Sequence, residues 1–118
     1  MLQALLNIMP HRRAALTARL VGVSGFTGRG DIRFAARKNE KNILFVDLRG
    51  LAGCTAMIFV NGTQVATIEI SKGRAGKSLS SRAGHKFPKI GPGDNIDVRQ
   101  NGDVILSGVF EHGSSQIA

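Results

Sequence analysis

The sequence predicts an all-β protein, an antiparallel β-sandwich or small barrel of about eight short strands. The first observation is a hairpin pattern in residues 55–71, where two runs rich in β-branched and large apolar residues flank Asn61-Gly62. Asn-Gly suits the positive φ angles of a tight two-residue turn. The second observation is the same pattern around Asn101-Gly102, which separates residues 95–100 from residues 103–110.

Length and composition indicate a single domain. The chain has 118 residues, of which 42% are hydrophobic, and a domain of this size can bury a sufficient core without disulfides. We expect residues 1–13 to form an apolar segment and basic linker, residues 14–111 the β domain and residues 112–118 a polar tail. The single cysteine, Cys54, excludes an internal disulfide, and we expect it to be a small buried apolar residue.

Residues 1–10 differ from the rest of the chain. Their apolar side chains fall at helical spacing: Leu2, Leu5, Leu6 and Met9. The positive charges follow this short run instead of preceding it, which is not the pattern of a secretory signal. A helix of about ten residues does not persist alone. We therefore hypothesise that these side chains pack on an adjacent subunit or an exposed sheet face, linking protomers into an oligomer or filament. The alternative is that the segment is only a leader.

Three strands are expected before the central hairpin, at residues 15–23, 31–37 and 43–49, because apolar and polar residues alternate there. The side chains expected to face the core are Leu16, Ala18 and Leu20, then Ile32, Phe34 and Ala36, then Leu44, Val46 and Leu48. Those expected on the polar face of the second strand are Asp31, Arg33 and Arg37.

The central hairpin is less determined, because residues 55–71 carry apolar side chains on both faces. Its register stays open, and the two apolar faces suggest a strand pair near the sheet centre or against a partner. Further along the chain, residues 77–82 are compatible with another short strand. Residues 103–110 then complete the second Asn-Gly hairpin and close the domain.

One short motif resembles a phosphate-binding loop. Gly76-Lys77-Ser78 matches the end of the pattern G-x-x-x-x-G-K-[ST], but Ser71 stands where the first glycine belongs. No helix is expected after it to hold a phosphate at its N-terminus. The sequence therefore argues against a nucleotide loop.

The residue types that carry metal or nucleophilic chemistry show no such spacing. The histidines, His11, His85 and His112, are far apart, and none has a second ligand at metal-binding spacing. Ser, His and Asp occur without a nucleophile-elbow pattern. We expect no metal, no cofactor and no enzymatic activity.

The charge balance favours anionic partners. Sixteen Lys and Arg face eight Asp and Glu, for a formal net charge of +8, which favours binding to polyanions without choosing among them. No apolar run approaches the ~20 residues that cross a bilayer. We therefore expect no integral membrane segment.

Residues 72–89 hold cations without a single acid. The cations are Lys72, Arg74, Lys77, Arg82, Lys86 and Lys89. This run is either a solvated face or a polyanion-binding surface, with nucleic acid or an acidic polysaccharide as the ligand. Single-strand binding also needs exposed aromatic rings, and Phe87 lies beside the cations. The alternative role for Phe87 is to plug one end of the core.

Part of the chain resembles a known family. The segments SGFTGRGDIRF, LFVDLRGLAGCTAMIFVNG and GPGDNIDVRQNGDVILSGVF are similar to the layout of bacterial cell-surface or secreted β-sandwich modules of the chordin-type (CHRD) domain family. The resemblance implies an extracellular or envelope-associated, non-catalytic module. Residues 55–58 stand where the family carries a histidine-containing stretch, so no functional residue is carried over.

The sequence as a whole predicts a non-catalytic structural or interaction module with a basic surface, located at the cell exterior and self-associating. The alternative is a small basic protein that binds polyanions through residues 72–89.

Overall fold

The computed structural model describes residues 15–36, 42–81, 84 and 87–113, and these form an antiparallel all-β fold. Its strands are β1 (Ala15–Gly22), β2 (Arg29–Ala36), β3 (Asn42–Arg49), β4 (Thr55–Val60), β5 (Thr63–Glu69), β6 (Arg74–Ser80), β7 (Asn95–Gln100), β8 (Asp103–Val109) and β9 (Glu111–His112). The predicted apolar segment at residues 1–13 lies outside the described residues. Of the predicted polar tail at residues 112–118, His112 belongs to β9, the Gly113 N–H donates a hydrogen bond to the Ala15 carbonyl, and residues 114–118 lie outside the described residues.

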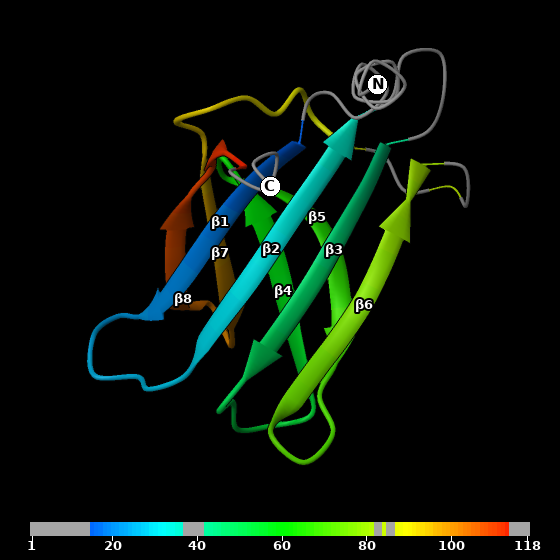
Figure 1. Cartoon of the computed structure of the whole chain (residues 1–118). Helices are drawn as coiled ribbons and strands as arrows, with labels where there is room; N and C mark the ends of the chain where they lie inside the picture. Colours follow the sequence, from blue (N-terminus) through cyan, green and yellow to red (C-terminus); the bar gives the residue numbers. More distant parts are fainter. Residues whose placement is uncertain (1–14, 37–41, 82–83, 85–86, 114–118) are drawn as a thin grey trace, which may run out of the picture.

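The main strands form one nearly closed, barrel-like sheet. They follow the order β5-β4-β7-β8-β1-β2-β3-β6, and β9 pairs with β1. Figure 1 shows β1, β2, β3 and β6 as the front layer, with β8, β7, β4 and β5 behind it. The predicted fold class, an antiparallel sandwich or small barrel of about eight strands, is confirmed.

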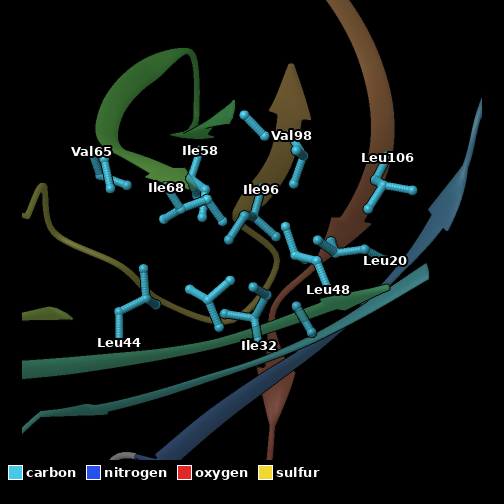
Figure 2. Packing of buried hydrophobic residues seen from close by; sticks show 14 of the residues in the cluster. Leu20, Ile32, Leu44, Leu48, Ile58, Val65, Ile68, Ile96, Val98 and Leu106 are labelled. Carbon is cyan, nitrogen blue, oxygen red and sulfur yellow. The ribbon is translucent and has the colours of Figure 1, made fainter. Parts of the chain in front are cut away.

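Alternation along the strands builds the core between these layers. The residues predicted to face inward on β1, β2 and β3 are buried: Leu16, Ala18, Leu20, Ile32, Phe34, Leu44, Val46 and Leu48. The opposite layer contributes Ile58, Ile68, Ile96, Val98 and Leu106. Figure 2 shows Leu20, Ile32 and Leu48 pointing towards Ile96 and Leu106. Arg37 and the side chain of Ala36 lie outside the described residues.

Both Asn-Gly pairs make the predicted tight turns. Asn61 and Gly62 have φ of 48° and 83°, and Asn101 and Gly102 have φ of 51° and 84°. These left-handed pairs are typical of two-residue type I′ hairpin turns. The prediction of two Asn-Gly hairpins is confirmed.

The register of the central hairpin, which the sequence left open, depends on a β-bulge. The β4–β5 pairing shifts after Ile58↔Ala66, so that Val65 is the extra residue and both Val65 and Ala66 are buried. Met57 on β4 faces outward and is partly exposed. The expectation of a strand pair near the sheet centre is met for β4, which lies between β5 and β7. It is not met for β5, which is the end strand of the order.

The strand expected at residues 77–82 begins earlier than predicted. β6 starts at Arg74, directly after a turn in which Lys72 and Gly73 have φ of 52° and 79°. Ser71 and Arg74 exchange backbone hydrogen bonds of 2.8 and 3.0 Å across this turn. The Lys72-Gly73 turn was missed because lysine rarely adopts this conformation.

The two ends of the sheet path meet differently. β8 pairs with β1 at Val21↔Ser107 and Gly22↔Leu106, which joins the two layers on one side. On the other side, the described residues show one isolated bridge between Ser71, which follows β5, and Arg74, the first residue of β6, and the two strands then diverge (Figure 1). The barrel is therefore closed at one seam and open at the other.

Candidate functional site

The outer face of β1, β2, β3 and β6 gathers most of the charged side chains of the front layer. Because alternate residues of a strand point to opposite faces, the residues between the buried ones face solvent here. The arginines on this surface, which we call the arginine face, are Arg19, Arg29, Arg33, Arg49 and Arg74.

Strand register places three of these arginines side by side. Arg29 on β2 pairs with Arg49 on β3, and Arg49 pairs with Arg74 on β6. Neighbouring strands lie about 4.8 Å apart, and like charges directly opposite one another destabilise a sheet. This row therefore concentrates positive potential across three strands and favours the binding of an anion.

The next row along the sheet partly neutralises the positive charge of these arginines. It contains Arg19, Asp31 and Asp47, paired in register. Arg49 lies 3.7 Å from Asp31 and 3.4 Å from Asp47. These exposed pairs add little stability, but they hold the Arg49 head at a defined place. Among the described residues no ion pair involves Arg29 or Arg74.

The arginine face is hollowed in two adjoining places. The larger hollow, of about 740 Å³, lies over β1, β2 and β3 and is lined by Arg19, Arg33, Asp31, Asp47, Thr17, Phe45 and Glu111, among others. The smaller hollow, of about 540 Å³, is lined by Arg19, Arg29, Arg49, Asp31 and the glycines of β2 and its preceding loop. Both hollows are lined by Arg19 and Asp31, so they adjoin each other.

An aromatic ring stands beside this surface. Phe45 is 41% exposed and pairs in register with Arg33 and Ser78. At the opposite rim, Glu111 on β9 pairs with Thr17. The larger hollow therefore offers cations, carboxylates and one apolar ring.

The cations of residues 72–89 do not share one face. Arg74 belongs to the arginine face, whereas Lys77 pairs with the buried Val46 and lies on the core side of β6. Lys72 is in the β5–β6 turn and Lys89 in the exposed loop before β7. Arg82 and Lys86 lie outside the described residues.

Phe87 packs against the core. Its ring meets Phe34 edge to face, with centroids 6.0 Å apart and an interplanar angle of 76°. This is the plugging role that the sequence left as the alternative to base stacking. Its half-buried ring leaves little surface for a base.

Gly76, Lys77 and Ser78 lie within strand β6. The expectation that no helix begins at this motif is therefore confirmed.

The remaining predicted sites have fewer described residues. His112 is exposed on β9, and His11 and His85 lie outside the described residues. In the part of the chain that the structure describes, no three His, Cys, Asp or Glu side chains lie close enough to hold a metal ion. No described helix is long and apolar enough to span a bilayer.

The residues predicted to mediate self-association also lie outside the described residues, so their role stays a prediction: Leu2, Leu5, Leu6 and Met9.

The prediction that Cys54 is buried is wrong. Cys54 is exposed in the connection between β3 and β4. Its carbonyl accepts a hydrogen bond of 2.7 Å from the N–H of Ile70. This hydrogen bond holds the backbone of Cys54 in the fold. Because Cys54 lies in a connection and not in a strand, no strand alternation turns its side chain towards the core.

The opposite layer presents a different kind of arginine. The Arg99 guanidinium lies 4.0 Å from the centre of the Phe59 ring, and Arg99 Nε donates a 2.8 Å hydrogen bond to Asp97. This hydrogen bond raises the pKa of Arg99 above its ordinary value. With one side on the ring and its Nε bound to the carboxylate, Arg99 is less free to bind a ligand than Arg29 or Arg74.

Sequence reasoning missed most of the arginine face. The alternation of residues 31–37 places Asp31 and Arg33 on a polar face, and that part is confirmed. Arg29, Arg49 and Arg74 come from three strands, and only their register brings them together. A search for single cationic runs could not have detected this row.

No protein-family model matches the chain, and the comparison with curated proteins gives no match. The resemblance to chordin-type domains therefore stays a prediction, and the fold and the arginine face carry the functional argument.

Proposed function

We propose that the chain is a non-catalytic interaction module that binds a polyanion on the arginine face. The observation that carries this proposal is the row formed by Arg29, Arg49 and Arg74 in register across three strands. A guanidinium presents its donors in a planar fork that matches carboxylate, sulfate and phosphate groups. Three such groups on a rigid sheet are positioned before a ligand arrives, which lowers the entropic cost of binding.

The arrangement of the charges supports the arginine face over the run at residues 72–89. Arg74 belongs to both, but Lys77 lies on the core side of β6, and Lys72 lies in a turn. A polyanion laid along the run would have to contact opposite sides of one strand. The arginine face instead offers a single surface, hollowed beside Arg19, Arg29 and Arg49.

A pair of charge-matched triple variants tests this assignment. One replaces Arg19, Arg29 and Arg74 with Gln, and the other replaces Lys72, Lys77 and Lys89 with Gln, so both lose three positive charges. Dextran sulfate binding is measured by calorimetry at a series of salt concentrations. The face variant should lower the slope of log affinity against log salt by about two to three, taking for each sulfate contact the roughly 0.7–0.9 that a nucleic-acid phosphate contributes.

The control variant should bind nearly as the parent protein does. Equal weakening in both variants would mean that only net charge matters, and the arginine face would then be no site. Binding of dextran sulfate that does not depend on salt, or no binding, would also refute the proposal.

Self-association and an extracellular or envelope location stay predictions from the sequence. Neither depends on the arginine face, and either is compatible with a polyanion-binding module.

A further inference from the structure

We infer that the polyanion is an acidic polysaccharide, a chain of sugars bearing both hydroxyls and spaced anionic groups. This inference rests on the proposed function and concerns the same surface. Its basis is the mixture of groups in the larger hollow, where Asp31, Asp47 and Glu111 lie among Arg19 and Arg33.

The carboxylates decide which anions fit. An ionised Asp or Glu only accepts hydrogen bonds, and so do phosphate and sulfate oxygens. A ligand that presents acceptors alone would bring its negative charge against Asp47 and Glu111 with nothing to donate to them. A sugar hydroxyl donates, so a hydroxylated anion can satisfy the carboxylates and the arginines together.

Glu111 is the clearest of these acceptors. Asp31 and Asp47 already face the Arg49 guanidinium at 3.7 and 3.4 Å. Glu111 is exposed at the rim of the hollow and has no ion pair among the described residues. Its oxygens are therefore open to a donor from the ligand.

Charge spacing points the same way. Duplex DNA carries one negative charge per roughly 1.7 Å of its axis, which suits a surface of uninterrupted cations. On the arginine face, the row of Arg29, Arg49 and Arg74 lies next to a row that contains two aspartates. A polysaccharide with one anionic group per sugar carries fewer charges per unit length than duplex DNA, which suits a surface where carboxylates lie among the cations.

The size and shape of the surface fit a chain. The larger hollow, about 740 Å³, is in the range of small-ligand sites, roughly 300–1,000 Å³. The smaller hollow shares Arg19 and Asp31 with it, so an extended ligand can occupy both. Phe45 lines the larger hollow with an exposed ring, against which the C–H face of a sugar can pack.

The test uses a substitution whose effect has opposite signs for the two kinds of polyanion. Glu111→Ala removes one negative charge and one acceptor from the hollow. Binding of polygalacturonate, which carries hydroxyls and one carboxylate per sugar, should weaken about three- to tenfold. Binding of a single-stranded oligonucleotide built from tetrahydrofuran abasic units, which has equal total charge and no hydrogen-bond donors along its length, should stay the same or strengthen, because a repulsive charge is lost.

Glu69→Ala is the matched control, since Glu69 is an exposed acid on β5 in the opposite layer. It should leave polygalacturonate binding unchanged or slightly stronger. The parent protein should also bind polygalacturonate more tightly than the oligonucleotide. Circular dichroism of both variants confirms that the fold is kept.

The possible failures are distinct. If Glu111→Ala strengthens polygalacturonate binding as Glu69→Ala does, or if the parent protein prefers the oligonucleotide, the polysaccharide inference is wrong while polyanion binding stands. If the parent protein binds neither polymer, the proposed function fails with it.

Discussion

The two Asn-Gly hairpins, β4–β5 and β7–β8, are near copies in local structure. Each has left-handed Asn and Gly residues at its turn. Each also has one bulged residue at the same place after the turn, Val65 in the first hairpin and Ile105 in the second. In both, the bulge turns two consecutive residues towards the core.

The copies are also related in space. β4 and β7 pair through Ile58 and Val98, which occupy the same position in their respective hairpins. A local two-fold axis therefore relates the halves of the layer β5-β4-β7-β8. This symmetry is nearly invisible in sequence, because the hairpins share little beyond the Asn-Gly pair and the pattern of apolar residues.

The hairpins differ in what lies beyond their outer strands, because β8 pairs with β1 whereas β5 ends the strand order. Much of this difference comes from one position. Gly108 on β8 pairs with Ile96, as Ile68 on β5 pairs with Ala56. A Cβ at Gly108 would lie 2.5 Å from the Arg19 carbonyl oxygen. The glycine thus lets β1 approach β8 and close the barrel, while Ile68 has its side chain in the core.

At the open seam, two features discourage further strand pairing. β5 carries the Val65 bulge, and β6 carries Lys77 on its core side between Ala75 and Leu79. Bulges and inward-pointing lysines are common ways to block an exposed sheet edge. Turn chemistry thus makes a hairpin, whereas single residues on its outer strand decide whether another strand can join it.

The largest expected effect comes from Gly108→Ala. The new Cβ would collide with the backbone of β1, which cannot move without opening the closed seam, so stability should fall by about 3 kcal/mol, the upper end of the usual cost of overpacking. Urea unfolding measures this change. Gly76→Ala on β6 is the control, because its Cβ would find its nearest neighbour at 3.8 Å, and it should stabilise by about 0.4–1 kcal/mol. Similar midpoints for the two variants would show that close approach at Gly108 does not hold the seam.

An intermediate effect is expected at the turns. Gly62→Val and Gly102→Val should each cost on the order of 1–3 kcal/mol, through backbone strain at a left-handed position. A Cβ at either glycine meets nothing within 4 Å, so the two costs should be similar. Thermal melts of both variants test this. Unchanged midpoints would mean that the turns do not depend on glycine, and a large difference between them would break the equivalence of the hairpins.

The smallest effect on stability, with the largest effect on association, is expected at Lys77. Lys77→Ile should change stability by no more than about 0.5 kcal/mol. It should, however, raise the molecular mass measured by light scattering, because the edge of β6 loses the positive charge that opposes pairing with a strand of another molecule. Lys77→Arg, which keeps the positive charge, should not raise the mass. An isoleucine variant with the mass of the parent protein would show that Lys77 does not protect this edge.

The local elements follow from short stretches of the sequence. Asn61-Gly62 and Asn101-Gly102 specify their turns because few residues adopt positive φ without strain. Alternation predicted the buried faces of β1, β2 and β3 correctly, since the period of a strand depends only on its own residues. Where the local signal was atypical, as at the Lys72-Gly73 turn, the start of β6 was misplaced.

Which strands pair, and which side chains share a surface, depends on the tertiary structure. Arg29, Arg49 and Arg74 form a row because β2, β3 and β6 pair in one register, although β6 follows β3 only after the β4–β5 hairpin. Conversely, Arg74 and Lys77 are close in sequence but lie on opposite faces of β6. The physical reason is that strand pairing joins residues far apart in the chain. Core packing and backbone hydrogen bonds together determine the register of each pair, so no single segment can specify it.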